Sequence, residues 1–492
     1  MKINRIIRLY SLAIMVCTVL VFIGCSKQNP TELTATDSVE LWIVTEDISP
    51  VSYTSVAMIK EVKNKFQEIH QEVSLRIDIL PTDESEREVY LERLRVEMLA
   101  GNGPDIYLMP TALAHDVEML IPDVNLAMNN GMFADISTYY DTDEKLETQD
   151  LHQDVMDAGV VDGTRYVLPL RFNMPVLFAD TAVLAENQIS IDSISNILGL
   201  LEIMTDIGKT AWTSVLHPSI ALNTHFETDS IEPYNCIGLS YLGQVMDYKS
   251  GTVNLSTDEL ARFIKAYGEL YSQFDYEQSY IATSVSGYSW GFSVLGENGP
   301  VYLGSLSSVP VMQAIANAEG RDLTIVPMES TAGETVANVT FYGAVGASCN
   351  QPELAYEFLR EFLTQEIQWN KVTNKRPGST LQSGNWPMPG FTVRTRDCIG
   401  KYWDLTKKSD TYSQSGEEIV RDRGKITGQS FTNEDFAILD TNIDHVRFQN
   451  PIEVDIVGNL FYNLQLEPLV EEACIEEAEK IIQELQWHLA EG

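Results

Sequence analysis

The chain has 492 residues, 44% of them hydrophobic, and a formal net charge of −38 at pH 7. This length is sufficient for two hydrophobic cores of ordinary domain size. So large an excess of acidic residues argues against binding nucleic acid or anionic lipid headgroups through a basic face. We interpret the acidity as a general surface charge that maintains solubility, rather than as a site for cations.

The N-terminus has the pattern of an export signal. Lys2, Arg5 and Arg8 precede an apolar run without charge, residues 9–24, which is short for a membrane span and typical of a signal-peptide core. The following Cys25 resembles the lipidated cysteine of the bacterial lipoprotein box. The resemblance implies a chain tethered by lipid to the extracellular side of the cell membrane, or to the periplasmic side if an outer membrane is present. The alternative is a plain secretory signal or anchor with a chance cysteine.

Removal of residues 1–24 from the 492 would leave 468 residues, with 30 Lys and Arg against 71 Asp and Glu and a net charge of −41. Residues 25–38 are mostly polar and are interpreted as a tether. No CxxC pair occurs among the cysteines beyond Cys25, so a metal site is not expected. Disulfides and free buried thiols remain open alternatives for these four cysteines, which are Cys236, Cys349, Cys398 and Cys474.

The first elements of the fold alternate between strand and helix. Residues 41–44 are predicted to form a strand, and residues 73–80 a second strand that ends at Pro81. Between them lies an amphipathic helix, because apolar residues recur there at helical spacing. These apolar residues are Val56, Ile59, Val62, Phe66 and Ile69.

The next helix and strand carry the clearest local signals. Leu91, Leu94 and Met98 lie on one helix face, and the sequence from Gly101 to Pro104 ends that helix. The apolar residues 106–109 then predict a short buried strand. A helix joined to a buried strand by a tight turn predicts an α/β protein with a partly parallel sheet, in which ligands lie beyond the carboxyl ends of strands. An ordinary α/β turn without a ligand is the alternative.

The rest of the chain continues the mixed α/β pattern, and no internal repeat was found. Predicted elements are a hairpin edge and strand within 163–170, an apolar run at 172–180, a mostly helical section at 181–291, a strand at 301–305, a helix to Ala318, a strand at 339–347, a helix from Pro352 and an acidic amphipathic helix at the C-terminus.

Five segments in order, spread over nearly all of the chain beyond the signal, resemble one family. They are AGNGPDIYLM, YVLPLRFNMPVLFAD, FSVLGENGPVYLGSLSS, FYGAVGASCNQPELAYEFLREFLTQEIQWN and EEACIEEAEKIIQELQWHL. Together with the lipoprotein box they resemble the extracellular solute-binding proteins of ABC importers, family 1. The resemblance implies a periplasmic-binding-protein-like fold of type II, in which a hinge joins two α/β lobes and the ligand lies in the cleft between them. It also implies binding of a carbohydrate, in particular an oligosaccharide, by hinge closure, without catalysis or a cofactor, by a monomer that delivers its solute to ABC permease subunits.

The same resemblance implies the bounds of the lobes. Lobe 1 would comprise residues 39–170 and 340–370, and lobe 2 residues 171–339 and 371–492. The crossings between the lobes are expected near residues 171–173, 338–340 and 373–377.

Candidate ligand-binding residues are polar or aromatic and lie in the expected strand-end loops and crossings, because aromatic rings stack on sugars and polar groups bind their hydroxyls. Arg171 has the alternative role of a salt bridge that fixes the hinge, Trp290 that of core packing, and Glu46 and Asp47 that of a solvated loop. The full set is Glu46, Asp47, Thr111, Arg171, Asn173, Trp290, Ser305, Tyr342 and Arg376.

Two other functional classes are compatible with parts of the sequence. The sequence Gly287–Gly291 matches G-x-S-x-G around Ser289, but a nucleophile elbow needs a strand before and a helix after the serine, and the flanking residues favour neither. Paired acids leave a secreted carbohydrate-active hydrolase open, and a ligand receptor for a sensor kinase would share the same binding form. Asp141-Thr142-Asp143 lacks the spacing of a calcium loop and is interpreted as a solvated turn.

Overall fold

The structure is a computed structural model of the whole chain. It describes residues 39–46, 54–111, 118–186, 188–208, 240–272, 301–306, 323–368, 391–394, 443–448, 450, 452–453, 456–457, 460, 463–464 and 469–491. Several expectations fall outside these residues: the signal and tether with Cys25, the helix to Ala318, Ser289, the cysteines 236 and 398, and the site candidates Asp47, Trp290 and Arg376.

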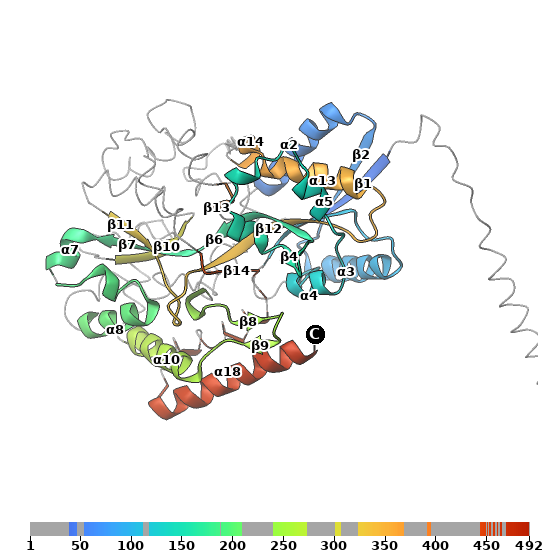
Figure 1. The fold of residues 1–492 in the computed structure, drawn as a ribbon. Coiled ribbons are helices and arrows are strands. Elements are labelled where there is room, and N and C mark those ends of the chain that lie inside the picture. The colour runs from blue at the N-terminus through green and yellow to red at the C-terminus, as the bar shows by residue number, and fades with distance from the viewer. Residues whose placement is uncertain are drawn as a thin grey trace, which may run out of the picture.

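A seven-stranded mixed sheet forms the centre of the described structure (Figure 1). Its strand order is β13-β6-β12-β3-β1-β2, and β14 pairs with β12. Strand β1 is parallel to both β2 and β3, whereas β12 is antiparallel to β3 and β6. The strands are β1 (Val39–Thr45), β2 (Val73–Ile79), β3 (Ile106–Pro110), β6 (Val167–Asn173), β12 (Val336–Val345), β13 (Phe391–Thr392) and β14 (His445–Phe448).

Each face of this sheet is covered by a different pair of helices, because successive strand residues point to opposite faces. From β1, Leu41 and Ile43 pack in the core that contains α2 (Thr54–Ile69) and α13 (Pro352–Arg360). Trp42 and Val44 pack on the other face, with α3 (Glu84–Leu99) and α4 (Val124–Asn129). The apolar spacing of α2 extends to its last residue, Ile69, but this side chain is 69% exposed.

The end of α3 confirms the local signals of the sequence. Gly101 has a positive φ of 76°, and its N–H donates to the Met98 carbonyl at 3.0 Å. The Asn102 N–H donates to the Glu97 carbonyl at 2.9 Å, which completes a Schellman motif. Asp105 then accepts from the Trp42 N–H at 2.8 Å and so fixes the start of β3 against β1.

A smaller antiparallel sheet, β10-β7-β11, lies beside the large one (Figure 1). Its strands are β7 (Pro175–Asp180), β10 (Val301–Ser305) and β11 (Leu323–Pro327). Only Met174 separates β6 of the large sheet from β7 of the small one. The chain returns between β11 and β12, and Asn173 is the register partner of Asn338. The two crossings between the sheets therefore lie side by side.

Helices α8 (Ile197–Gly208), α10 (Thr257–Ser272) and α18 (Glu471–Glu491) pack together on the side of the smaller sheet (Figure 1). No helix in the described part of the chain is long and apolar enough to cross a membrane. The remaining elements are α5 (Ser137–Asp141), η1 (Thr148–Asp150), α6 (Gln153–Asp157), β4 (Val160–Val161), β5 (Thr164–Arg165), α7 (Thr181–Glu186), η2 (Ile191–Ser193), β8 (Met246–Asp247), β9 (Thr252–Val253), η5 (Glu361–Leu363) and α14 (Gln365–Gln368).

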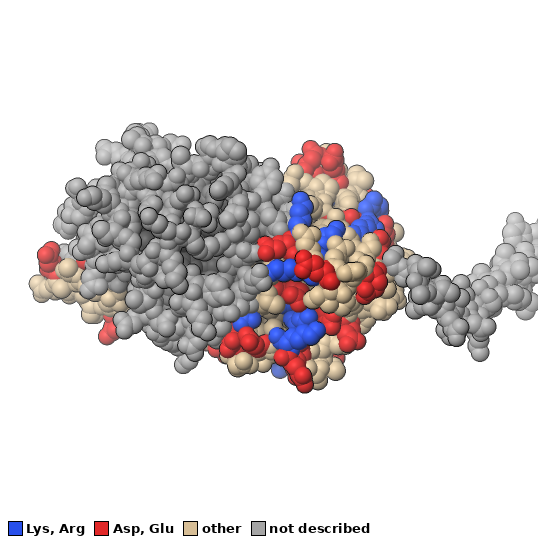
Figure 2. All heavy atoms as spheres, turned by 90° about the horizontal axis from the view of Figure 1, so that it is seen from above, with Lys and Arg blue, Asp and Glu red and all other residues tan. Residues whose placement is uncertain are grey.

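The surface charge of the described residues is mixed. In the view of Figure 2, Lys and Arg side chains lie among Asp and Glu side chains and do not gather into one basic face.

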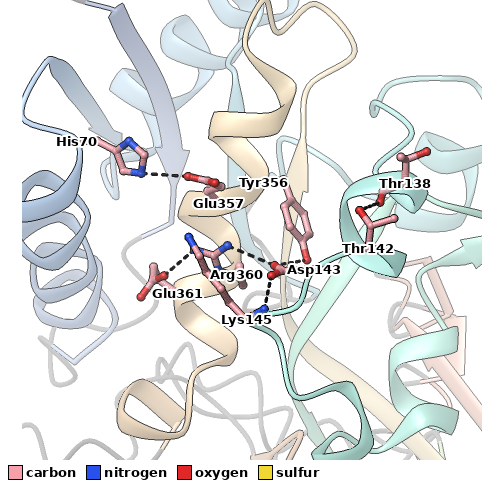
Figure 3. Close-up of polar contacts among 9 residues, drawn as sticks. All are labelled: His70, Thr138, Thr142, Asp143, Lys145, Tyr356, Glu357, Arg360 and Glu361. Carbon is pink, nitrogen blue, oxygen red and sulfur yellow. Dashed lines mark hydrogen bonds and ion pairs between the residues drawn. The ribbon is translucent and has the colours of Figure 1, made fainter.

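In the turn Asp141-Thr142-Asp143, the first two residues are exposed as expected, but the Asp143 side chain is only 6% exposed. One of its carboxylate oxygens accepts from the Tyr356 hydroxyl at 3.1 Å and from the Arg360 guanidinium at 3.3 Å (Figure 3). The other accepts from the Lys145 N–H at 2.9 Å. Burial and the nearby Asp143 carboxylate raise the pKa of Tyr356. Asp143 therefore fastens this turn to α13.

Replacing Asp143 with Asn keeps an acceptor for Tyr356 but removes the charge that faces Arg360. We expect the free energy of unfolding to fall by about 1.5–3 kcal/mol, the usual contribution of a hydrogen bond to a charged group. Urea unfolding followed by circular dichroism measures the change. Asp141→Asn is the control, since Asp141 is exposed and surface substitutions change stability by about 0.5 kcal/mol or less. Equal effects of the two substitutions would contradict an anchoring role for Asp143.

Candidate functional site

The neighbouring strands β1 and β3 are parallel and end at the same edge of the large sheet, where Pro110 of β3 pairs with Phe341 of β12. We call this region the strand-end edge. Glu46 directly follows β1, and Thr111 directly follows β3. The Thr111 N–H donates to the Thr340 carbonyl at 3.2 Å, and its hydroxyl donates to the Val339 carbonyl at 2.6 Å. Thr111 therefore joins the end of β3 to β12, and its hydroxyl proton is already used within the protein.

The Glu46 side chain is only 2% exposed and forms an ion pair with Arg87 of α3. The two guanidinium Nη atoms donate to the two carboxylate oxygens at 2.9 and 2.6 Å. Such a bidentate pair is both strong and geometrically specific. The expectation of a solvated loop at Glu46 is thus wrong, and its carboxylate has a structural partner. A ligand contact for Glu46 stays a prediction.

Arg87 also holds the segments that follow the neighbouring strands. Its Nε donates to the Glu118 carbonyl at 2.6 Å, and its Nη1 donates to the Pro81 carbonyl at 3.0 Å. One guanidinium therefore connects the segments that follow β1, β2 and β3. Arg87 was missed from the sequence, although it precedes Leu91 by four residues and so lies on the buried stripe of α3.

Arg171 is fully buried in a network beside the crossing from β6 to β7. Its Nη2 donates to the Gln368 carbonyl at 2.8 Å, and burial lowers the pKa of the guanidinium to about 9. The Gln368 side chain donates to the Leu170 carbonyl at 3.1 Å and accepts from the Thr392 hydroxyl at 2.8 Å. These contacts favour a structural role for Arg171. This role resembles the alternative considered from the sequence, in which Arg171 fixes the hinge. A ligand contact for Arg171 stays a prediction.

Asn173 and Ser305 lie together where the chain passes between the two sheets. The Asn173 side chain accepts from the Met174 N–H at 3.1 Å and is fully buried. Ser305 ends β10 as the register partner of Pro175, and the next N–H, that of Leu306, donates to the Met174 carbonyl at 2.9 Å. The structure thus brings these two candidates to the same crossing.

Tyr342 is fully buried and packs edge-to-face against Phe448 of β14, with 5.9 Å between ring centroids. Burial raises the pKa of its hydroxyl well above the ordinary value. Within the described residues this hydroxyl has no hydrogen-bond partner. Because β14 covers the ring, stacking of Tyr342 on a sugar is not available in this conformation. The sequence could not show this, since β14 lies about a hundred residues downstream.

The candidates therefore fall into three groups. Glu46 and Thr111 lie at the strand-end edge, Asn173 and Ser305 at the crossing, and Arg171 and Tyr342 within strands β6 and β12 of the large sheet. No group of three or more His, Cys, Asp or Glu side chains arranged for a metal ion occurs among the described residues.

Comparisons with known proteins identify the fold of this chain by structure and not by sequence. No family model matches the sequence, and no curated protein matches it by sequence. The structure matches an extracellular solute-binding protein family 1 from Alicyclobacillus acidocaldarius with a TM-score of 0.53 and 13% identity, over 93% of this chain and 100% of the other. It matches the GacH receptor of Streptomyces glaucescens, solved unliganded and with acarbose, with a TM-score of 0.51 and 13% identity, over 91% and 99%.

A de novo designed cysteine esterase, ECH19, is equally similar, with a TM-score of 0.53 and 11% identity over 92% of this chain and 99% of the other. A shared fold thus does not decide activity. The expected mixed α/β architecture is confirmed: this chain has the periplasmic-binding-protein-like fold of the extracellular solute-binding proteins.

Proposed function

We propose that the chain is a lipid-anchored extracellular solute-binding protein that captures a carbohydrate, in particular an oligosaccharide, for an ABC importer. The observation that carries this proposal is the match of fold over 93% of this chain and the whole of a family 1 solute-binding protein. The GacH receptor, which shares the fold and was solved in complex with acarbose, supports carbohydrate as the class of solute. The lipid at Cys25 and delivery to permease subunits by a monomer belong to the same proposal.

The mechanism is hinge closure without chemistry. The two sheets supply two bodies, and β6 continues into β7 across a single residue, Met174, so bending at the crossings moves one sheet against the other. Lobe 1 would comprise residues 39–170 and 340–370, and lobe 2 residues 171–339 and 371–492. The proposed second lobe includes β13 and β14, which pair with β6 and β12 of the large sheet. A ligand that gains contacts with both bodies only when they close shifts the population toward the closed form.

A thermal-shift screen of a soluble form starting at Ser26 tests the proposal. The screen covers oligosaccharides, polyols, sugar phosphates and peptides. A bound ligand at a hundredfold excess over its dissociation constant adds about 2.7 kcal/mol to stability. We expect a rise of the melting temperature with one class of oligosaccharide and recovery of that sugar unchanged by chromatography.

Two results would overturn the proposal in different ways. Consumption of the sugar would identify a hydrolase. A response to peptides or sugar phosphates, with none to oligosaccharides, would replace the class of solute and keep the binding function.

A further inference from the structure

A buried polar cluster joins four segments that are far apart in the chain. We call Asp123, Tyr248, Asn450 and His488 the Asp123 cluster. One carboxylate oxygen of Asp123 accepts from the Tyr248 hydroxyl at 2.5 Å and from the Asn450 amide at 2.7 Å. The same oxygen lies 3.7 Å from Nε2 of His488. The Asn450 amide also donates to the Tyr248 hydroxyl at 2.5 Å.

Asp123 belongs to the large sheet through α4. Its second carboxylate oxygen accepts from the Leu126 N–H at 2.9 Å and so caps the N-terminus of α4. Helix α4 packs in the core on one face of the large sheet. Because the carboxylate is only 7% exposed, its hydrogen bonds are shielded from water and are stronger than surface contacts. Burial, and next the Asp123 carboxylate, raise the pKa of Tyr248.

Two partners of Asp123, Tyr248 and His488, lie outside the large sheet, whereas Asn450 follows a strand of that sheet. Tyr248 lies in the turn between β8 and β9, and His488 lies in the last turns of α18. Helix α18 packs on α10 and β9. Asn450 follows β14.

Helix α18 therefore spans the distance between the two bodies. Its 21 residues correspond to a length of about 31 Å. In its first turn Glu471 accepts from Lys265 of α10 at 2.8 Å, and farther along the helix its buried residues Ala478 and Ile481 still face the core. Near its C-terminal end His488 faces Asp123, and Figure 1 shows α18 running below α10 and ending below α4.

We propose that the Asp123 cluster is a lock that fastens α18 and the β8–β9 hairpin to α4, and thereby regulates how far the two sheets can move apart. This inference rests on the proposed hinge-closing function. Helix α18 packs on α10 and α10 on α8, and the first N–H of α8 donates to the Glu329 carbonyl just after β11. If these helices move with the small sheet, its movement separates α18 and the β8–β9 hairpin from α4 and removes the Tyr248 hydrogen bond to Asp123. The lock therefore favours the arrangement of the two sheets in which the Asp123 cluster is intact. Weakening the lock changes the fraction of molecules that are ready to bind a ligand.

Substitution of Tyr248 by Phe tests the lock, since it removes one donor and leaves the cap of α4 intact. Hydrogen bonds to charged groups are strong enough that their loss changes an equilibrium by about tenfold or more. We expect amide exchange in residues 485–491 to accelerate by about that factor. We also expect the radius of gyration of the unliganded protein, from X-ray scattering, to increase. Asp123→Asn should change both quantities in the same direction.

Tyr356→Phe is the matched control. It removes the same type of bond, from a tyrosine hydroxyl to a buried aspartate. This bond joins α13, which packs on the large sheet, to Asp143 in the turn after α5. We expect it to leave the exchange of α18 and the radius of gyration unchanged.

Neither readout needs a ligand, so failure of carbohydrate binding leaves this test intact. Unchanged exchange in α18 and an unchanged radius of gyration for folded Tyr248→Phe would overturn the lock. An equal response of Tyr356→Phe would overturn it as well, because the effect would then reflect general loss of stability. Where a sugar is found, a changed affinity in Tyr248→Phe with wild-type affinity in Tyr356→Phe would support regulation of the site.

Discussion

Replacing Arg87 with Met should lower the free energy of unfolding by about 3–5 kcal/mol, the usual cost of breaking a buried ion pair by removing one partner. Glu46, 2% exposed, would lose both guanidinium bonds and remain as a buried charge. The carbonyls of Pro81 and Glu118 would lose their donor at the same time. Urea unfolding followed by circular dichroism measures the loss.

Arg93→Met is the matched control for this experiment. Arg93 lies on the same helix, but it is exposed and its Nε lies 3.7 Å from Glu97 one turn away. Such exposed pairs contribute about 0.3–0.5 kcal/mol. A second test is the double substitution of Arg87 by Met and Glu46 by Leu, which should recover part of the loss because no buried charge remains. If Arg87→Met and Arg93→Met lowered stability equally, the clamp on the strand-end segments would be disproved.

Replacing Gly346 with Ala should cost about 3 kcal/mol or more, the upper part of the range for overpacking in a core. An added Cβ would lie 2.2 Å from the Pro104 carbonyl oxygen and 3.3 Å from the Tyr107 ring. The Pro104 oxygen is backbone, and the Gly346 N–H is itself bonded to the Asp105 carbonyl at 2.9 Å, so neither strand can move aside freely. The melting temperature and the urea midpoint measure the effect.

Gly251→Ala is a control that changes stability through backbone strain alone, without a steric clash of the added Cβ. Gly251 has a φ of +66° in the turn between β8 and β9, but nothing lies within 4 Å of a Cβ placed there. Alanine at this position should cost about 1–2 kcal/mol through its left-handed conformation alone. A smaller loss for Gly346→Ala than for Gly251→Ala would show that the two strands do not approach as closely as described.

Gly346 also explains why two of the family-like segments are recognisable. AGNGPDIYLM supplies Pro104 and most of β3, and FYGAVGASCN supplies the second half of β12 and Gly346. The two segments are antiparallel neighbours in the large sheet. Their glycine and small residues allow close packing of strands. The resemblance therefore indicated the fold correctly.

The sequence by itself determined the elements whose signals are local. The helix end at Gly101, the buried strand predicted at 106–109 and the helix opened by Pro352 all depend on residues within a few positions of one another. The observed strand β3 also includes Pro110, which was expected to break it. The alternation of strands and helices then determined the α/β class. The local periodicity failed at Ile69, where the helix ends and its last residue turns to solvent.

Only the tertiary structure decided what the polar side chains do. Glu46 and Asp143 looked like solvated residues, yet each is buried against an arginine, 41 and 217 residues away respectively. Tyr342 was a candidate ligand-binding residue, yet it is fully buried and packs edge-to-face against Phe448 of a distant strand. The Asp123 cluster joins residues up to 365 positions apart, from 123 to 488. A charged side chain gives the same local pattern whether it faces water or a buried partner, because its environment is set by segments that meet only after the chain has folded.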